Sequence, residues 1–87
     1  MKIKIRSYGS FRDILGKEVE IDLMEPAQVE DAIRILRDQH LEFQKDFTDE
    51  TLIVLNDRVV LRNHGAIESK TLINGDILSI FPPVSGG

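Results

Sequence analysis

Cysteine is absent from this chain of 87 residues, and histidine occurs only twice. Without cysteine, the chain can supply no disulfide bond, no thiolate metal ligand and no thiol nucleophile. His40 and His64 lie far apart and fit no metal-ligand spacing, so we expect both on the surface and predict no metal site. The sequence also shows no recognisable pairing of a nucleophile with a base.

Long apolar runs are missing as well. No segment is long enough to cross a membrane, and the N-terminus is typical of a strand rather than of a signal peptide. We therefore expect a cytoplasmic protein with no membrane partner. Acidic residues outnumber basic ones by 15 to 11, which gives a net charge of −4 and argues against nucleic acid as a partner.

The nearest approach to a basic patch is the alternation of Lys2, Lys4 and Arg6 with Ile3 and Ile5. Such alternation favours the solvent face of a half-buried strand. A contact surface for an acidic partner is the alternative that these three cations leave open.

Hydrophobic periodicity predicts one small α+β domain. The expected strands are residues 2–8, 18–23, 52–55, 58–60 and 77–81, the main helix is 28–40, helical turns fall at 11–15 and 43–47, and turns fall at 56–57 and 74–76. This order is typical of the β-grasp (ubiquitin-like) fold, a mixed sheet of about four to five strands with one main helix on one face. In that fold the first and last strands are central neighbours. Ala27 and Gln28 are poor N-cap residues, so the sequence defines the start of the helix least well.

The last predicted strand runs into Phe-Pro-Pro-Val-Ser-Gly-Gly, residues 81–87. Each proline lacks the N–H that strand pairing needs, and glycine adds no side-chain bulk. We therefore expect a domain of residues 1–81 and a flexible tail of residues 82–87, which would reach about 20 Å when extended. Such a tail can carry the carboxylate of Gly87 into the active site of another protein, although an inert disordered end has the same composition.

The carboxylate of such a tail needs activation before it can react. It is an anion at neutral pH, with a pKa near ~3.5, and is therefore a poor electrophile. Conversion to an acyl-adenylate with ATP would give it a good leaving group.

Both ends of the chain resemble the MoaD/ThiS family of ubiquitin-like sulfur carriers, and within it the small subunits of molybdopterin synthase. The ending combines Asn74-Gly75-Asp76, a hydrophobic strand and residues 81–87. At the start, a strand running into Tyr8 is followed by Phe11-Arg12-Asp13-Ile14-Leu15-Gly16. The tail is the specific part of this resemblance, and the rest is typical of β-grasp domains in general.

The resemblance implies that an E1-like enzyme adenylates Gly87 with ATP and that a sulfur donor then converts it to a thiocarboxylate. The tail would insert into the large subunit of molybdopterin synthase, where its sulfur passes to a pterin precursor to form the dithiolene of molybdopterin. This chain would bind no cofactor and would contribute only its carboxyl terminus to the chemistry. The inserted residues before Gly87 would be Pro82, Pro83, Val84, Ser85 and Gly86.

Phe81 is the candidate docking residue beside the tail. It alternates with Leu78 and Ile80, so it points outward to a partner if those two residues face the helix. The alternative is that Phe81 closes the end of the core. Tyr8 and Leu61 are further candidates for the same surface.

Three other functions use the same features. A ubiquitin-like modifier would join Gly87 to a lysine of a target protein after the same adenylation step. An interaction module would carry an inert tail. A sulfur carrier for another pathway, such as thiamine synthesis, would share the carrier chemistry, but such chains are typically shorter and lack Phe-Pro-Pro.

Overall fold

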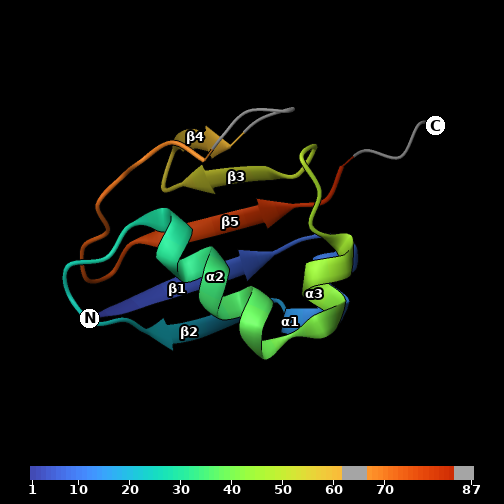
Figure 1. Cartoon of the computed structure of the whole chain (residues 1–87), viewed down its shortest axis with the longest axis horizontal. Helices are drawn as coiled ribbons and strands as arrows, with labels where there is room; N and C mark the ends of the chain where they lie inside the picture. Colours follow the sequence, from blue (N-terminus) through green and yellow to red (C-terminus); the bar gives the residue numbers. More distant parts are fainter. Residues whose placement is uncertain (62–66, 84–87) are drawn as a thin grey trace.

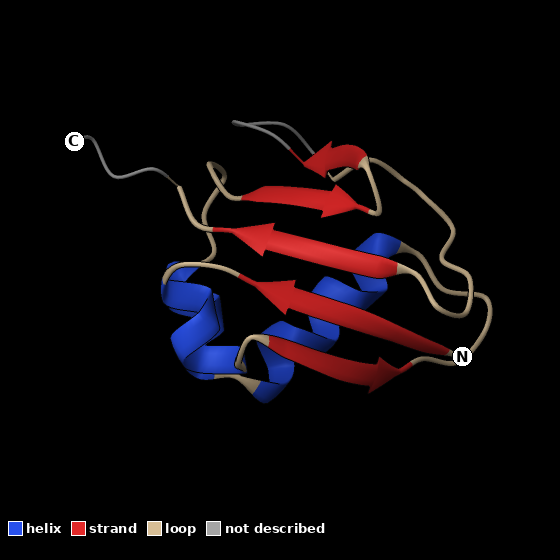
Figure 2. Cartoon of the chain, turned by 180° about the vertical axis from the view of Figure 1, so that it is seen from behind, coloured by secondary structure: helices blue, strands red, loops and turns tan. Residues whose placement is uncertain are grey.

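The computed structural model describes residues 1–61 and 67–83. In this part of the chain, five strands form one mixed sheet with helices on one face, and the view from behind shows the sheet in front of all of them (Figures 1 and 2). The strands are β1 (Lys2–Ser7), β2 (Glu18–Asp22), β3 (Leu52–Leu55), β4 (Arg58–Leu61) and β5 (Ile77–Phe81). The helices are α1 (Ser10–Leu15), α2 (Val29–Gln39) and α3 (Leu41–Asp46).

The strand order β2-β1-β5-β3-β4 puts β5 at the centre of the sheet with β1 beside it. β1 and β5 run parallel, whereas the other three neighbouring pairs are antiparallel. The predicted β-grasp fold, with its first and last strands as central neighbours, is thereby confirmed. Because β1 and β5 are parallel, the chain leaves both strands at the same end of the sheet.

The core lies between the helices and one face of the sheet. Ile3 and Ile5 of β1 are fully buried and alternate with exposed basic residues. α2 contributes an apolar stripe at helical spacing, formed by Val29, Ala32, Ile33 and Leu36. Full burial of an aliphatic side chain stabilises a fold by about 1.5–3 kcal/mol, so this layer gives the tail a rigid base.

Two buried aromatic rings close the core at the end where β5 finishes. Phe11 of α1 and Phe43 of α3 have ring centroids 5.0 Å apart, at an angle of 44°. Their contact holds α1 and α3 together beside the last residues of β5 (Figure 1). The helical turns predicted near 11–15 and 43–47 are both present, as α1 and α3.

The start of α2 carries a cap that the sequence interpretation missed. The helix begins at Val29, and Oδ2 of Asp31 accepts a hydrogen bond from the backbone N–H of Gln28 (2.8 Å). A carboxylate in the first turn stabilises a helix because it satisfies a free backbone donor there. Asp31 thus provides the cap for which Ala27 and Gln28 are poorly suited.

The end of the sheet opposite to the tail is held by Asn56 and Asp76. Asp76 is 7% exposed; its two carboxylate oxygens accept hydrogen bonds from Nδ2 of Asn56 (3.2 Å) and from the N–H of Ile73 (2.8 Å). Oδ1 of Asn56 accepts the N–H of Ile77 (3.1 Å). The predicted turns at 56–57 and 74–76 are present and are joined by these contacts.

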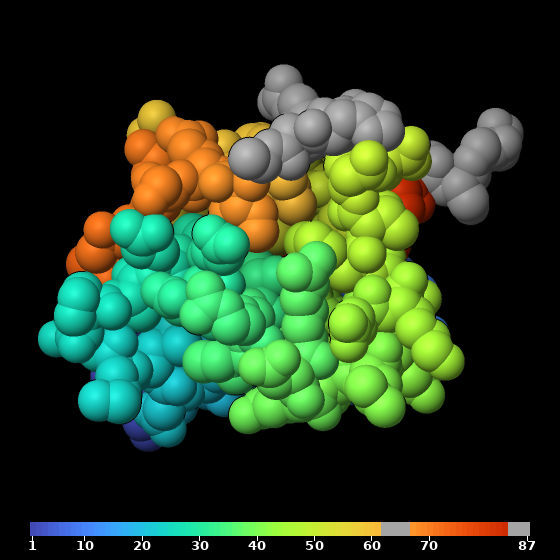
Figure 3. Space-filling model, in the orientation of Figure 1, coloured from blue at the N-terminus to red at the C-terminus, as the bar shows by residue number. Residues whose placement is uncertain are grey.

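The helical face of the molecule is covered by α2 and α3, and residues 67–73 run beside the start of α2 (Figure 3). His40 lies half-buried at the junction of α2 and α3, and His64 lies outside the described residues. Within residues 1–61 and 67–83, no helix combines the length and the apolar character needed to cross a membrane.

Candidate functional site

The root of the tail is fixed to the body through β1. The backbone N–H of Tyr8 donates a hydrogen bond to the carbonyl oxygen of Ile80 (3.1 Å), which extends the β1–β5 pairing beyond Ser7. The rings of Tyr8 and Phe81 then stack, with centroids 4.4 Å apart and 9° between their planes. The structure therefore brings together two of the predicted docking residues at the point where the tail leaves the sheet.

The first tail residues also contact the body. Gly9 has a φ of +56°, and a Cβ built on it would lie 2.6 Å from Cγ of Pro82. Pro82 and Pro83 are half-buried, and together with Ser10 and Asp46 they line a shallow depression beside α1. The root of the tail is thus seated against the loop between β1 and α1.

The sheet face away from the helices carries an apolar strip next to the tail root. Leu78 and Ile80 of β5 are buried in the core, and Phe81 lies in the opposite strand phase. The register of β5 with β3 places Leu52 beside Phe81. We call this half-buried surface the sheet-face strip; it consists of Tyr8, Leu52, Val54, Val59, Ile77 and Phe81.

Leu61 does not belong to this surface, and the prediction that placed it there is wrong. Its side chain is 4% exposed and is part of the core. The cause is an irregularity between β3 and β4, where Val54 pairs with Val59 but Ile53 pairs with Leu61. The extra residue, Val60, shifts the alternation by one position and turns Leu61 to the same side as buried Ile53.

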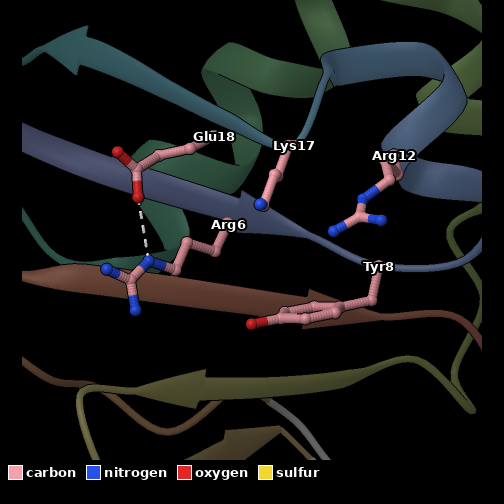
Figure 4. A pocket seen from close by; sticks show the side chains of 5 residues that line it. All are labelled: Arg6, Tyr8, Arg12, Lys17 and Glu18. Carbon is pink, nitrogen blue, oxygen red and sulfur yellow. Dashed lines mark hydrogen bonds and ion pairs between the residues drawn. The ribbon is translucent and has the colours of Figure 1, made fainter.

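A basic groove of about 520 Å³ lies next to Tyr8. Figure 4 shows that Lys17 and Arg12 point their charged ends into the space beside Tyr8, with Arg6 and Glu18 at the other end. Nε of Arg6 donates a hydrogen bond to Oε1 of Glu18 (2.9 Å). Further along the same two strands, a second ion pair joins Lys2 to Glu20 (3.7 Å). The alternating cations of β1 are therefore largely paired across the sheet, as expected for a solvated strand face.

The pKa of the Glu18 carboxyl is lowered from its ordinary value. The main cause is the hydrogen bond from Arg6; desolvation opposes it, and the nearby charges of Lys4, Arg6 and Lys17 lower the pKa further. Glu18 thus stays ionised and keeps Arg6 neutralised over most of the accessible pH range.

The predicted tail residues Val84, Ser85, Gly86 and Gly87 lie outside the described residues, so their roles stay predictions. Residues 1–61 and 67–83 contain no cluster of three His, Asp or Glu side chains that could hold a metal ion. The sequence interpretation missed two features of the site, namely the contact of Gly9 with Pro82 and the convergence of Arg12 with Lys17. A glycine directly after Tyr8 was the available signal for the first, whereas the second depends on how α1 folds back beside β1.

A β-grasp body whose central strand leads into a proline–glycine tail defines a ubiquitin-like carrier class of fold. The family model of the ThiS family matches residues 5–87, so this chain belongs to the ThiS family. A search of curated protein sequences gave no match.

Solved structures give the same fold. A Pyrococcus furiosus protein provisionally described as molybdopterin converting factor subunit 1 is 29% identical, with a TM-score of 0.77 over 97% of this chain and 99% of that one. A chain of the Helicobacter pylori complex of molybdopterin-converting factor subunits 1 and 2 is 25% identical, with a TM-score of 0.66 over 100% of both chains. SAMP1 of Haloferax volcanii, at 24% identity and a TM-score of 0.80 over 100% of both chains, shows the fold alone.

Proposed function

We propose that this chain is a sulfur carrier and the small subunit of a molybdopterin synthase. An E1-like enzyme joins the Gly87 carboxylate to AMP with release of pyrophosphate from ATP. A donor that delivers sulfide then displaces AMP, which leaves a thiocarboxylate on Gly87. The sulfur passes from there to a pterin precursor held by the large synthase subunit, and water then cleaves the bond between this sulfur and the Gly87 acyl carbon, which regenerates the carboxylate.

The observation that carries this proposal is the seated root of the tail. Phe81 ends the central strand, Tyr8 stacks on it, and Pro82 packs on Gly9, so the first residues of the tail are held against the body. Presentation of this kind reduces the entropy lost when a tail enters a partner's active site. The ThiS family match over residues 5–87 and the likeness to the molybdopterin converting factor structures from Pyrococcus furiosus and Helicobacter pylori support the same function.

The large synthase subunit is the expected partner, because the related Helicobacter pylori structure is a complex of subunits 1 and 2. The sheet-face strip beside the tail root gives such a partner an apolar surface, with Phe81 and Tyr8 as the aromatic anchors. The E1-like enzyme and the sulfur donor are further partners that the chemistry requires.

A second candidate function is protein modification, in which Gly87 forms an isopeptide bond with a lysine. The likeness in fold to SAMP1, the small archaeal modifier protein 1 of Haloferax volcanii, supports protein modification as this second candidate. Both functions share the adenylation of Gly87, so they differ only in the acceptor.

ATP–pyrophosphate exchange with the E1-like enzyme of the same organism tests the shared step. We expect exchange with the full chain, loss of exchange when Gly87 is deleted, and near-normal exchange in the matched variant Ser85→Ala, which keeps the terminus. Incubation with a sulfide donor, the large subunit, a pterin precursor and cell proteins then separates the acceptors, with the dithiolene assayed chemically and Gly87 linkages found by peptide mapping. Dithiolene formation supports the carrier, whereas Gly87 joined to lysines supports the modifier, and exchange that persists without Gly87 contradicts both.

A further inference from the structure

Two cations at the tail root have no counter-ion. Among residues 1–61 and 67–83, the cations that form ion pairs are Lys2, Arg6, Arg34, Arg58 and Lys70, whereas those that form none are Arg12, Lys17, Lys4, Arg37 and Lys45. Arg12 and Lys17 are the two of these unpaired cations that line one groove together, beside the tail root.

The two cations converge on the same space. Figure 4 shows the charged ends of Arg12 and Lys17 both reaching into the space beside Tyr8, from α1 and from the loop before β2. Arg6 at the far end of the groove is already paired with Glu18 at 2.9 Å, so the groove has a surplus of two positive charges. Two positive charges that line one groove attract an anion to it, and both belong to exposed side chains that a partner can reach.

The position of the groove indicates what the anion belongs to. Its floor is the ring of Tyr8, which stacks on Phe81, and the next residue in the chain, Gly9, contacts Pro82. The four residues after Pro83 can span at most about 14 Å even when fully extended. Any enzyme that acts on Gly87 must therefore lie close to the tail root, and its surface must cover this end of the body.

We propose that the groove formed by Tyr8, Arg12 and Lys17 is a docking site for a carboxylate-bearing segment of the E1-like enzyme that acts on Gly87 in the function proposed above. Arg12 can bind a carboxylate with two parallel N–H groups, and Lys17 adds a second positive charge. The Tyr8 hydroxyl, which makes no hydrogen bond to a described residue, is available as a donor at the same place.

Carboxylates fit this groove better than phosphates or nucleic acid do. The surplus is only two charges, Glu18 lies at the edge of the groove, and the chain as a whole has a net charge of −4. A polyphosphate or an oligonucleotide would meet this negative field over its whole length, whereas one acidic side chain or two would meet only the local cations.

The test is the affinity of the full chain for the purified E1-like enzyme of the same organism, measured by calorimetry without ATP so that no chemistry is needed. The variant Arg12→Gln/Lys17→Gln removes the two surplus charges, and Arg58→Gln/Lys45→Gln is the control with the same change in net charge outside the groove. We expect the dissociation constant to rise about tenfold in the groove variant and less than about twofold in the control. Raising the salt from about 50 to 500 mM should remove most of the difference, because these charges are screened by salt.

Each outcome decides the inference. Equal affinities of the wild type and the groove variant, or no binding of the wild type, would overturn it. It would also be overturned if the same substitutions abolished saturable binding of inorganic phosphate, ATP or a single-stranded oligonucleotide while leaving enzyme binding intact. Normal adenylation with unchanged affinity would reject the docking groove and keep the proposed function. Binding that depends on the groove, without activation of Gly87, would keep the docking groove and reject the proposed function.

Discussion

The ring of Pro82 occupies the place where a side chain on Gly9 would lie. A Cβ on Gly9 would come within 2.6 Å of Cγ of Pro82, and no real side chain tolerates such a distance to a ring that cannot move away freely. Pro82, the first residue of the tail, therefore packs in the space that a side chain on Gly9 would fill, just after the end of β1. The direction in which the tail leaves the body depends on this contact.

Substitution Gly9→Ala should displace Pro82 and slow the activation of Gly87. Gly75→Ala is the matched control, because Gly75 also has a positive φ (+92°) but a Cβ there would meet nothing within 4 Å. Backbone strain should lower the free energy of unfolding by about 1–3 kcal/mol in both variants. Only Gly9→Ala should shift the NMR signals of Pro82 and lower kcat/KM for adenylation, by about tenfold. Equal adenylation by both folded variants would show that the seat of Pro82 has no part in presenting the tail.

The stacked rings of Tyr8 and Phe81 should stabilise each other. A double-mutant cycle with Tyr8→Ala and Phe81→Ala should give a coupling of about 0.5–1.5 kcal/mol in urea unfolding, the range of aromatic pairs at this separation. A second cycle, of Leu52→Ala with Phe81→Ala, measures the coupling of Phe81 to an aliphatic neighbour on the adjacent strand for comparison. Strictly additive effects of the two aromatic substitutions would mean that the rings do not stack in solution.

Ser7 is a buried residue whose hydroxyl contributes nothing favourable that the structure shows. It is 1% exposed, and its Oγ has no hydrogen-bond partner among the described residues. Ser7→Ala should therefore leave the free energy of unfolding unchanged or raise it by up to about 1 kcal/mol, because an unsatisfied buried hydroxyl is costly. Ser79→Ala, on the opposite face of the sheet, should change it little. A loss of stability in Ser7→Ala would indicate that the hydroxyl has a partner.

The ion pair of Arg6 with Glu18 predicts a pH effect of defined sign. The folded pKa of Glu18 is lowered, chiefly by the hydrogen bond from Arg6, so its contribution to stability is present above the ordinary glutamate pKa of about 4.3. This contribution is lost as the pH falls through the lowered pKa. NMR titration of the Glu18 side-chain carbonyl should show its pKa rising toward the ordinary value in Arg6→Gln. An unchanged pKa in that variant would assign the shift to another group.

Local patterns in the sequence were sufficient to predict the β-grasp order. Alternation in residues 2–6 and 18–23 defined two strands, and the spacing of Val29, Ala32, Ile33 and Leu36 defined the main helix. The strand phase of β5 also placed Phe81 opposite Leu78 and Ile80. These features depend on residues close together in the chain, where periodicity is informative.

Features that depend on distant contacts could not be predicted in the same way. The burial of Leu61 follows from the extra residue Val60 in the pairing of β4 with β3, which alternation along β4 alone does not reveal. Asp31 caps α2 from inside its first turn, and Gly9 matters only because Pro82 arrives from the other end of the chain. Each required the partner segment to be in place.

The most direct test of the sulfur-carrier function is the intact mass of the chain after incubation with its E1-like enzyme, ATP and a sulfide donor. Exchange of one carboxylate oxygen for sulfur should add about 16 Da, and the added mass should be absent when ATP is omitted or Gly87 is deleted. Fragmentation should place the added mass on Gly87. An unchanged mass with every sulfide donor, in a preparation that does form the adenylate, would contradict the sulfur-carrier function.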